Sequence, residues 1–359
     1  MTGLTRLIVL GLVLTAFAPS ADAMTWPRAL ALAHAVIYQH NTNAFRQLQD
    51  AARQGDSAAQ TALGMMYQYG QGVTPNLPRA FHWYQLAARQ GIARAQNHLG
   101  FMYQHGKGVT PNLPRAVHWF KLAARQGDAG AQTNLGVMYQ YGQGVTPNLP
   151  RAVHWYQLAA RQGYARAQDN LGVMYATSQG VTPNLPRAVH WFQLAARQGY
   201  AQAQSNLGIM YESGKGVTPN LPRAVHWFQL AARQGFAQAQ NNLGFMYENG
   251  KGVTPNLPRA VHWYQLAARQ GYKPAIKRLR ALQQQLQRTA HARSLQSPAA
   301  PAPAGAQRAS TAFPVHDQQQ SVRNLQRFWT LYFQAAHARL VDFGAPALVQ
   351  PVSFAAAHP

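Results

Sequence analysis

The chain has 359 residues, of which 47% are hydrophobic, 32 are Lys or Arg, 9 are Asp or Glu and none is Cys. The absence of cysteine excludes disulfides, thiolate metal sites and a cysteine nucleophile. The aliphatic and aromatic content excludes a wholly disordered chain, and no apolar run reaches the roughly 20 residues that a membrane-spanning helix needs. The formal net charge of +23 results from a scarcity of acids, so composition leaves the chemistry of a partner open.

The first 23 residues have the three parts of a secretory signal. Arg6 precedes an apolar run of eleven residues, and the small-residue sequence Ala21-Asp22-Ala23 follows. The apolar run is too short to span a bilayer, and a buried N-terminal helix is the alternative interpretation. The order of the parts predicts cleavage after Ala23, which makes Met24 the first residue of a periplasmic or secreted protein.

Tryptophan recurs every 36 residues, and most of its neighbours recur with it, as the sequence signature of a stacked repeat array requires. The repeated positions are Trp83, Trp119, Trp155, Trp191, Trp227 and Trp263. Six units cover residues 59–274 and are preceded by a degenerate capping repeat over 24–58. A polar capping helix is predicted over 275–293, because a stacked array needs a polar surface at its end.

Each unit predicts two helices, as in the unit from Ala203 to Gln238. Leu207, Gly208 and Tyr211 share one face of the first helix, and we expect Gly208 to let a partner backbone approach closely. The second helix carries an apolar stripe at i, i+3 and i+4 spacing, and Asn220 is its predicted N-cap. Neither helix can bury its stripe alone, so the units must stack into an all-α solenoid.

The repeated pattern resembles a known family. A-Q-x-N-L-G-x-M-Y-x-x-G-x-G-V, followed by A-V-H-W-x-Q-L-A-A-R-Q-G, is similar to the Sel-like repeat of the tetratricopeptide clan, and the resemblance covers residues 44–283. It implies a right-handed α-solenoid and a scaffold or adaptor that binds other proteins, often after export. The chain departs from the family at Ser178, which replaces a loop glycine, and in having few acidic residues.

Motifs for catalysis are absent from the sequence. It contains neither H-E-x-x-H nor Ser-x-x-Lys, and the loop between Gly100 and Gly106 lacks the spacing of a phosphate-binding loop. We therefore predict no catalytic, metal-binding or cofactor-binding residues. A hydrolase acting on cell-wall material is the least favoured alternative, because the carboxylates of the repeats occur singly. They are Asp128, Asp169, Glu212 and Glu248, each in a different unit.

Histidine occupies one position of every second helix. Neighbouring units place these side chains roughly 10 Å apart, too far for two of them to share a zinc ion, so we predict solvent-facing positions. A pH-sensing role is the alternative. The six residues are His82, His118, His154, His190, His226 and His262.

Arginine forms two rows on the second helices. Rows of cations attract acidic polymers, although solvated helix faces explain them equally well. The first row is Arg79, Arg115, Arg151, Arg187, Arg223 and Arg259. The second row is Arg89, Arg125, Arg161, Arg197, Arg233 and Arg269.

Variation between the units is concentrated near the end of the first helix. Because the resemblance implies that first helices line the concave face, we predict a strip there that binds a protein partner. Neutral drift on a solvated face is the alternative. The candidate binding strip comprises Gln68, Tyr69, Gln104, His105, Gln140, Tyr141, Thr177, Glu212, Ser213, Glu248 and Asn249.

The C-terminal part of the chain has a different composition. Residues 294–320 are rich in Pro, Ala and Gln and predict an extended linker, and 321–342 predict a separate amphipathic helix with an aromatic stripe. We expect this helix to dock on the surface of the solenoid, and docking on another chain or on a membrane surface is the alternative. The tail over 343–359 gives no signal.

The sequence as a whole predicts an exported, non-catalytic scaffold that binds a protein partner through its solenoid surface. The alternative is a basic surface that binds acidic envelope polymers, and no specific nucleic acid is expected.

Overall fold

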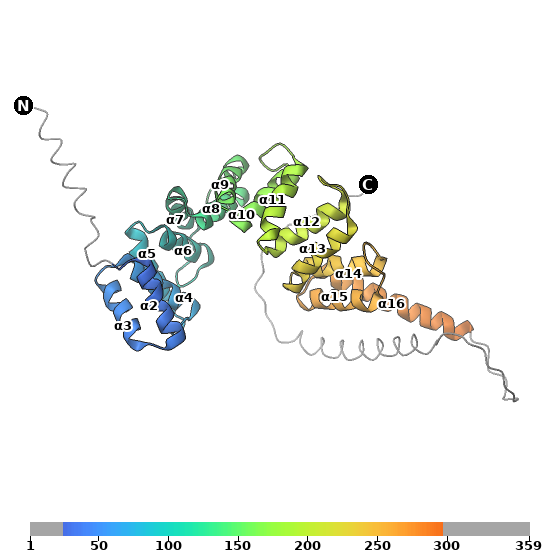
Figure 1. Cartoon of the computed structure of the whole chain (residues 1–359), viewed down its shortest axis with the longest axis horizontal. Helices are drawn as coiled ribbons and strands as arrows, with labels where there is room; N and C mark the ends of the chain where they lie inside the picture. The colour runs from blue at the N-terminus through green and yellow to red at the C-terminus, as the bar shows by residue number, and fades with distance from the viewer. Residues whose placement is uncertain (1–23, 297–359) are drawn as a thin grey trace, which may run out of the picture. The chain divides into compact units, whose positions relative to one another are not determined.

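The computed structural model describes residues 24–296, and within this range it contains fifteen α-helices and no strands (Figure 1). The predicted all-α solenoid of paired helices is therefore confirmed. The signal segment, the separate C-terminal helix and the tail lie outside the described residues, as does the linker from 297 onward. No described helix is long and apolar enough to cross a membrane.

The helices follow the repeat in strict alternation. The first helices of the six units are α4 (Ser57–Tyr69), α6 (Ala93–His105), α8 (Ala129–Tyr141), α10 (Ala165–Ala176), α12 (Ala201–Ser213) and α14 (Ala237–Asn249). The second helices are α5 (Leu77–Arg89), α7 (Leu113–Arg125), α9 (Leu149–Arg161), α11 (Leu185–Arg197), α13 (Leu221–Arg233) and α15 (Leu257–Arg269). The array begins with α2 (Trp26–Gln39) and α3 (Thr42–Arg53) and ends with α16 (Lys273–Gln296).

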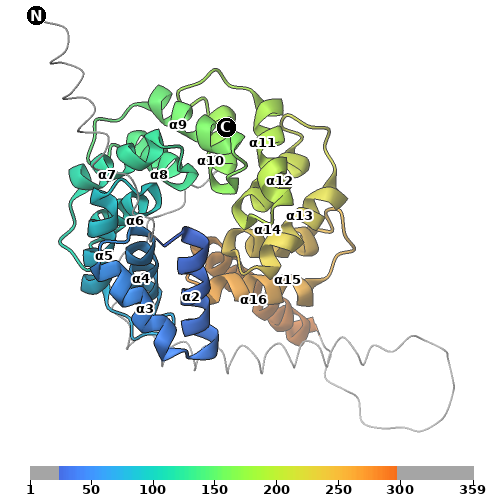
Figure 2. The same cartoon turned by 60° about the vertical axis from the view of Figure 1, so that its left-hand side comes forward.

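The two sets of helices form an inner and an outer layer. Figure 2 shows the units following one another around a curve, with α6, α8, α10 and α12 on its inner side and their partners α7, α9, α11 and α13 outside. The expectation that first helices line the concave side is therefore confirmed. We call the solvent-accessible side of the first helices the inner face and that of the second helices the outer face.

Every second helix starts in the same way. The Asn220 side chain accepts a hydrogen bond of 2.9 Å from the backbone N–H of Arg223, and Pro222 lies in the first turn, where its missing N–H costs nothing. The same cap occurs at the other five second helices. The predicted cap is confirmed, and it fixes the point where each loop ends.

The glycine of the first helix has a different role from the expected one. An added Cβ at Gly208 would lie 2.5 Å from Cε1 of Phe228, so this glycine makes room for an aromatic ring of the same unit and not for a partner backbone. Backbones do approach closely at the second loop glycine. A Cβ at Gly108, which has φ +71°, would lie 2.4 Å from the backbone of Leu77 in the preceding unit. The loops therefore set the spacing between units.

The fourth unit adopts the same loop without its glycine. Ser178 has φ +59°, in the left-handed region that costs a non-glycine residue of order 1 kcal/mol. Its helix, α10, ends at Ala176, one residue earlier than the equivalent helices. The fourth unit thus keeps the left-handed loop conformation with a residue that disfavours it.

Buried glutamines join the units. The Gln132 side chain donates to the backbone carbonyl of Ala124 in the preceding unit (3.2 Å) and accepts from Nε2 of Gln162 (2.8 Å). The equivalent side chains make these bonds in the other units. An amide can donate and accept at once, which explains why glutamine fills this buried position in all six units.

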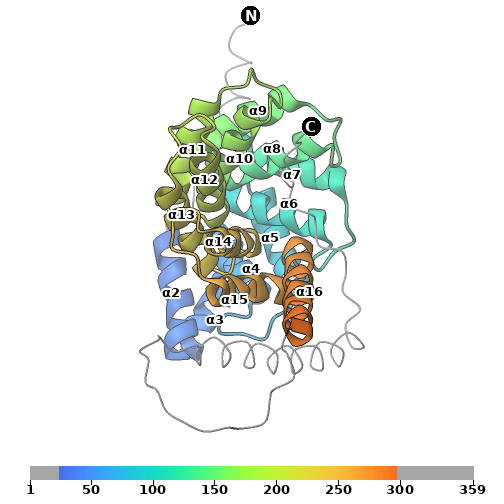
Figure 3. The ribbon, with the colours of Figure 1, turned by 90° about the vertical axis from the view of Figure 1, so that its right-hand side faces the viewer.

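The closing helix covers the last unit. Ala275, Leu279 and Leu282 of α16 are buried, and Arg278 pairs with Glu248 of α14. Figure 3 shows α16 in orange beside α15 at the end of the array. The helix begins two residues before the predicted range of 275–293 and extends three residues beyond it.

Candidate functional site

An apolar row crosses the inner face. Each first helix contributes one half-buried apolar side chain larger than alanine, and the helix register places these side chains at equivalent positions in consecutive units. Each lies two residues from the buried leucine and two residues from the buried tyrosine of its helix, so the helix period puts it on the opposite side from these core side chains. Because the first helices form the inner layer, this opposite side belongs to the inner face. We call them the inner apolar row: Met65, Phe101, Val137, Val173, Ile209 and Phe245.

Polar side chains next to this row bond across the unit boundaries. Asn134 donates to Asn97 (3.1 Å), and Arg166 in turn donates to Asn134 (3.2 Å). In the next pair of units Asn206 donates to Asp169 (2.9 Å). We call these five residues the polar ladder. Asparagine at 134, 170, 206 and 242 was a signal of this ladder in the sequence, but positions that vary little between units were ascribed to repeat geometry.

Asp169 is the buried carboxylate of this ladder. Its side chain is 3% exposed and its partner in the ladder is an uncharged amide, Asn206. Burial raises the pKa of Asp169 to about 7, against a smaller lowering by the hydrogen bond from Asn206. Other units have Thr, Asn or Ser at this position, so the repeat itself does not require an acid.

His98 takes the place of asparagine in the second unit. Its ring stacks on Tyr84, with 4.7 Å between the centroids and 5° between the planes. Burial, together with the nearby Arg94, lowers the pKa of His98 to about 4. The imidazole of His98 is therefore uncharged at neutral pH.

The candidate binding strip divides into two positions. Its first position bonds within the chain. Gln68, Gln140 and Glu248 accept hydrogen bonds of 2.7 to 2.8 Å from the hydroxyl groups of Tyr84, Tyr156 and Tyr264 respectively. Gln104 donates to Gln143 of the next unit, and Glu212 lies 3.6 Å from Lys251. These five side chains are half-buried.

The second position of the strip is more open. Tyr69 and Tyr141 are 55% and 53% exposed, and His105, Ser213 and Asn249 are also exposed, whereas Thr177 is half-buried. The last four of these side chains contact the carbonyl of the residue four positions earlier in their own helix. Tyr69 and Tyr141 are therefore the large exposed aromatic side chains of the candidate binding strip.

The outer face is basic. The six second helices expose two arginines each and contain no carboxylate. The first arginine of each helix lies over a tyrosine ring of the same unit, at 5.6 to 5.9 Å from its centroid. The six histidines are exposed, as predicted, and each lies edge-on to the neighbouring tryptophan.

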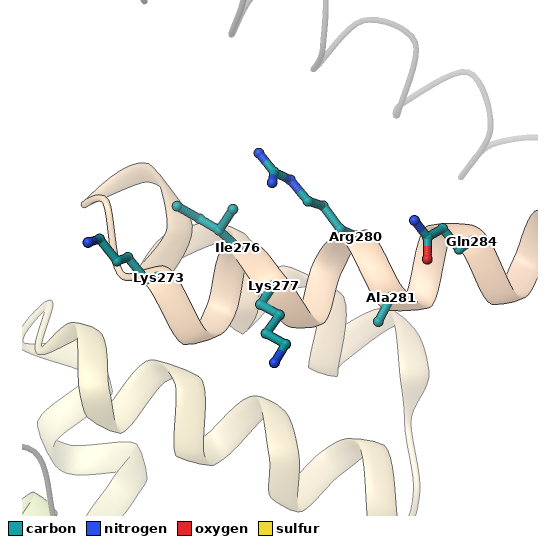
Figure 4. A pocket seen from close by; sticks show the side chains of 6 residues that line it. All are labelled: Lys273, Ile276, Lys277, Arg280, Ala281 and Gln284. Carbon is teal, nitrogen blue, oxygen red and sulfur yellow. The ribbon is translucent and has the colours of Figure 1, made fainter. Parts of the chain in front are cut away.

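Neither a metal centre nor a catalytic cluster emerges from the described part of the chain. Over residues 24–296 no three His, Cys, Asp or Glu side chains lie close enough to hold a metal ion. A hollow beside α16 is lined by Lys273, Ile276, Lys277, Arg280, Ala281 and Gln284. Figure 4 shows that Lys277 and Arg280 project in opposite directions from this one helix, so its polar groups do not converge on a substrate.

Comparison with known proteins agrees with this geometry. The model of the Sel1 repeat matches six consecutive segments, 57–92, 93–128, 129–164, 165–200, 201–236 and 237–272. The crystal structure of a Sel1 repeat protein from Oxalobacter formigenes is 33% identical with a TM-score of 0.61, over 67% of this chain and 96% of that one. None of the curated protein sequences matches.

A second solved structure is similar to the same extent. It is c5321, a protective antigen of uropathogenic Escherichia coli strains with an SLR fold, which is 34% identical with a TM-score of 0.61. The match covers 72% of this chain and 56% of that one, so the chain spans little more than half of the antigen's length.

Proposed function

The chain belongs to the Sel1 repeat family, and from this premise we propose that it is an exported, non-catalytic scaffold that holds a protein partner on its inner face. Sel1 repeat proteins are generally protein-interaction scaffolds. Export rests on the Arg6 to Ala23 signal, which lies outside the described residues. The inner face supplies the observation that carries the proposal.

That observation is the inner apolar row beside the polar ladder. Packed helices lie about 8–10 Å apart, so each apolar side chain can contact successive apolar residues of one partner segment. The row is half-buried, so its side chains have less rotamer freedom to lose on binding, which lowers the entropic cost. The exposed tyrosines at its edge, Tyr69 and Tyr141, offer amphipathic contact area of the kind enriched at interfaces.

Charged substitutions in the inner apolar row are expected to abolish partner binding. Val137→Lys combined with Ile209→Lys places two cations where an apolar partner surface must be desolvated, while the long lysine stems still cover the helix surface. The mature protein is immobilised and incubated with envelope extract, and its partners are quantified by mass spectrometry. We expect the variant to recover at least about tenfold less of them.

The matched control is Arg151→Gln combined with Arg187→Gln on the outer face. It should retain the partners, and both variants should keep the helical circular dichroism of the parent. Partners that persist with the lysine variant and disappear with the glutamine variant would refute recognition by the inner face.

A second candidate function is supported by the charge of the outer face. Every described acid outside the ladder is already engaged: Asp56 and Asp128 cap helices, and Asp50, Glu212 and Glu248 form ion pairs. The outer arginines therefore have no carboxylate among the second helices to neutralise them. Because the face curves outward, a flexible acidic polymer can follow it, whereas a flat bilayer meets only a few units at once.

Retention on an immobilised polyuronate tests this second candidate. We expect the protein to elute earlier as salt rises, since screening weakens contacts between exposed charges. Arg151→Gln, Arg187→Gln and Arg223→Gln together should elute at clearly lower salt than Val137→Lys with Ile209→Lys. Equal elution of the parent and the arginine variant would argue against a polymer-binding role.

A further inference from the structure

The start of the described chain is bonded to the array at an unusual carboxylate. The backbone N–H of Met24 donates a hydrogen bond of 2.7 Å to Oδ2 of Asp56, across 32 residues of sequence. The other oxygen, Oδ1, accepts from the backbone N–H of Ala59 at 2.7 Å and so caps α4. One carboxylate oxygen of Asp56 thus caps α4, and the other accepts a hydrogen bond from Met24.

Apolar contacts hold Met24 in the same place. Its side chain is half-buried against the cluster formed by α2, α3 and α4, which includes Leu48 and Leu63. The position of the Met24 nitrogen is therefore set by packing as well as by the hydrogen bond.

Comparison between units shows that the repeat does not require this aspartate. The residues at the same N-cap position in four other units are Ile92, Tyr164, Tyr200 and Phe236, and none of them caps its helix through a side chain. The remaining unit has Asp128, whose Oδ1 accepts from Ala131 and from Asn97 of the preceding first helix. No full unit precedes Asp56, so no first helix can donate to it as Asn97 donates to Asp128. The backbone N–H of Met24 takes the place of that second donor.

We propose that Asp56 is the receptor for the α-ammonium group that signal cleavage creates at Met24. The inference rests on the export proposed above. Signal peptidase hydrolyses the amide between Ala23 and Met24: water supplies a hydroxyl to Ala23, which leaves as a carboxylate, and hydrogen to the Met24 nitrogen. The new amine takes up a proton at neutral pH, because the ordinary pKa of an α-amino group is about 8.

Cleavage is expected to strengthen the hydrogen bond between Met24 and Asp56 without moving either residue. An amide with one N–H becomes an ammonium with three N–H donors and a positive charge, next to an acceptor already 2.7 Å away. Charge-assisted hydrogen bonds are roughly twice as strong as neutral ones. The processed chain therefore holds α2 against α4 more firmly than the precursor does, and maturation closes the N-terminal end of the array.

Hydrogen–deuterium exchange of α2 tests the proposal independently of the cell. A fusion cut directly before Met24 gives the native ammonium, and a second fusion leaves one extra alanine that displaces it. Each is prepared as the parent sequence and as the Asp56→Asn variant. We expect the extra alanine to speed exchange in residues 26–39 several-fold in the parent and to have no effect in the variant. Asp128→Asn, which weakens the equivalent cap in another unit, should leave α2 unchanged.

Equal exchange with and without the extra alanine in the parent would overturn the proposal, as would an equally large effect of the alanine in the Asp56→Asn variant. Export is tested separately by the N-terminal mass of the protein recovered from the periplasm or medium. A first residue other than Met24 would overturn the processing step. A protein that stays inside the cell and still carries residues 1–23 would contradict the proposed export.

Discussion

Replacing Asp169 with asparagine is expected to stabilise the protein at pH 8 and to remove the loss of stability that this carboxyl group causes as pH rises from 4 to 8. The carboxyl group has an ordinary pKa of 3.8, which burial raises to about 7. Between these values the folded protein holds a proton that the unfolded chain has released. The contribution of Asp169 to the free energy of unfolding therefore falls as pH rises through this window, whereas His98, with its lowered pKa, contributes a rise below about pH 6.5.

The size of the effect follows from the shift. Each pKa unit corresponds to 1.36 kcal/mol, so a shift of about three units lowers stability by up to about 4 kcal/mol above pH 7. Asparagine keeps an oxygen that can accept from Asn206 and carries no charge at any pH. The chain already contains this residue at the equivalent positions Asn97 and Asn241. The gain at pH 8 should amount to about 2–4 kcal/mol.

Urea unfolding at pH 4.5, 6 and 8 provides the measurement. The matched control is Glu212→Gln, which removes one charge from the ion pair with Lys251 in the next unit. It should change stability by less than about 1 kcal/mol, as expected for a partly exposed pair. An Asp169→Asn protein with unchanged stability at pH 8 would mean that the carboxylate is hydrated or paired in solution.

Replacing Gln132 with glutamate is expected to destabilise the array by about 2–4 kcal/mol. The side chain is 4% exposed, and its amide donates to the carbonyl of Ala124 while its oxygen accepts from Gln162. An ionised glutamate cannot donate to Ala124, so a buried carbonyl loses its partner and a charge is left in an apolar setting.

Thermal unfolding followed by circular dichroism at pH 7 checks this result. Gln157→Glu makes the same chemical change on a half-buried position of the second helix, where the second unit carries Lys121, and should be nearly neutral. Equal midpoints for the two variants would contradict the role of the buried glutamines in joining the units.

The fold was predictable because the information for it lies within one unit. Helix periodicity, the Asn220 cap and the loop glycines all act over a few residues, and the 36-residue period repeats them six times. The role of Gly208 was mistaken because its contact, the ring of Phe228, lies on the other helix of the unit. The spacing of residues within one helix does not show which side chain of the other helix fills the space that a glycine leaves by lacking a Cβ.

The candidate site was harder to predict, since its contacts join different units. Asp169 and Asn206 are 37 residues apart, and nothing local marks them as partners. The contacts of the first position of the binding strip were also not predictable from the position alone. Its bonded residues Gln68, Gln140 and Glu248 occur in units whose second helix has tyrosine at 84, 156 and 264, whereas the other units have phenylalanine there. The second helix thus decides which partner this position bonds to, and not whether the position carries glutamine or glutamate.

Hydrogen–deuterium exchange of the complex with its captured partner tests most directly whether the inner face is the recognition surface. Binding on the inner apolar row predicts slower exchange in the six first helices, from α4 to α14, with the six second helices, from α5 to α15, unchanged. Protection confined to the second helices, which form the arginine-bearing outer face, would contradict recognition by the inner face.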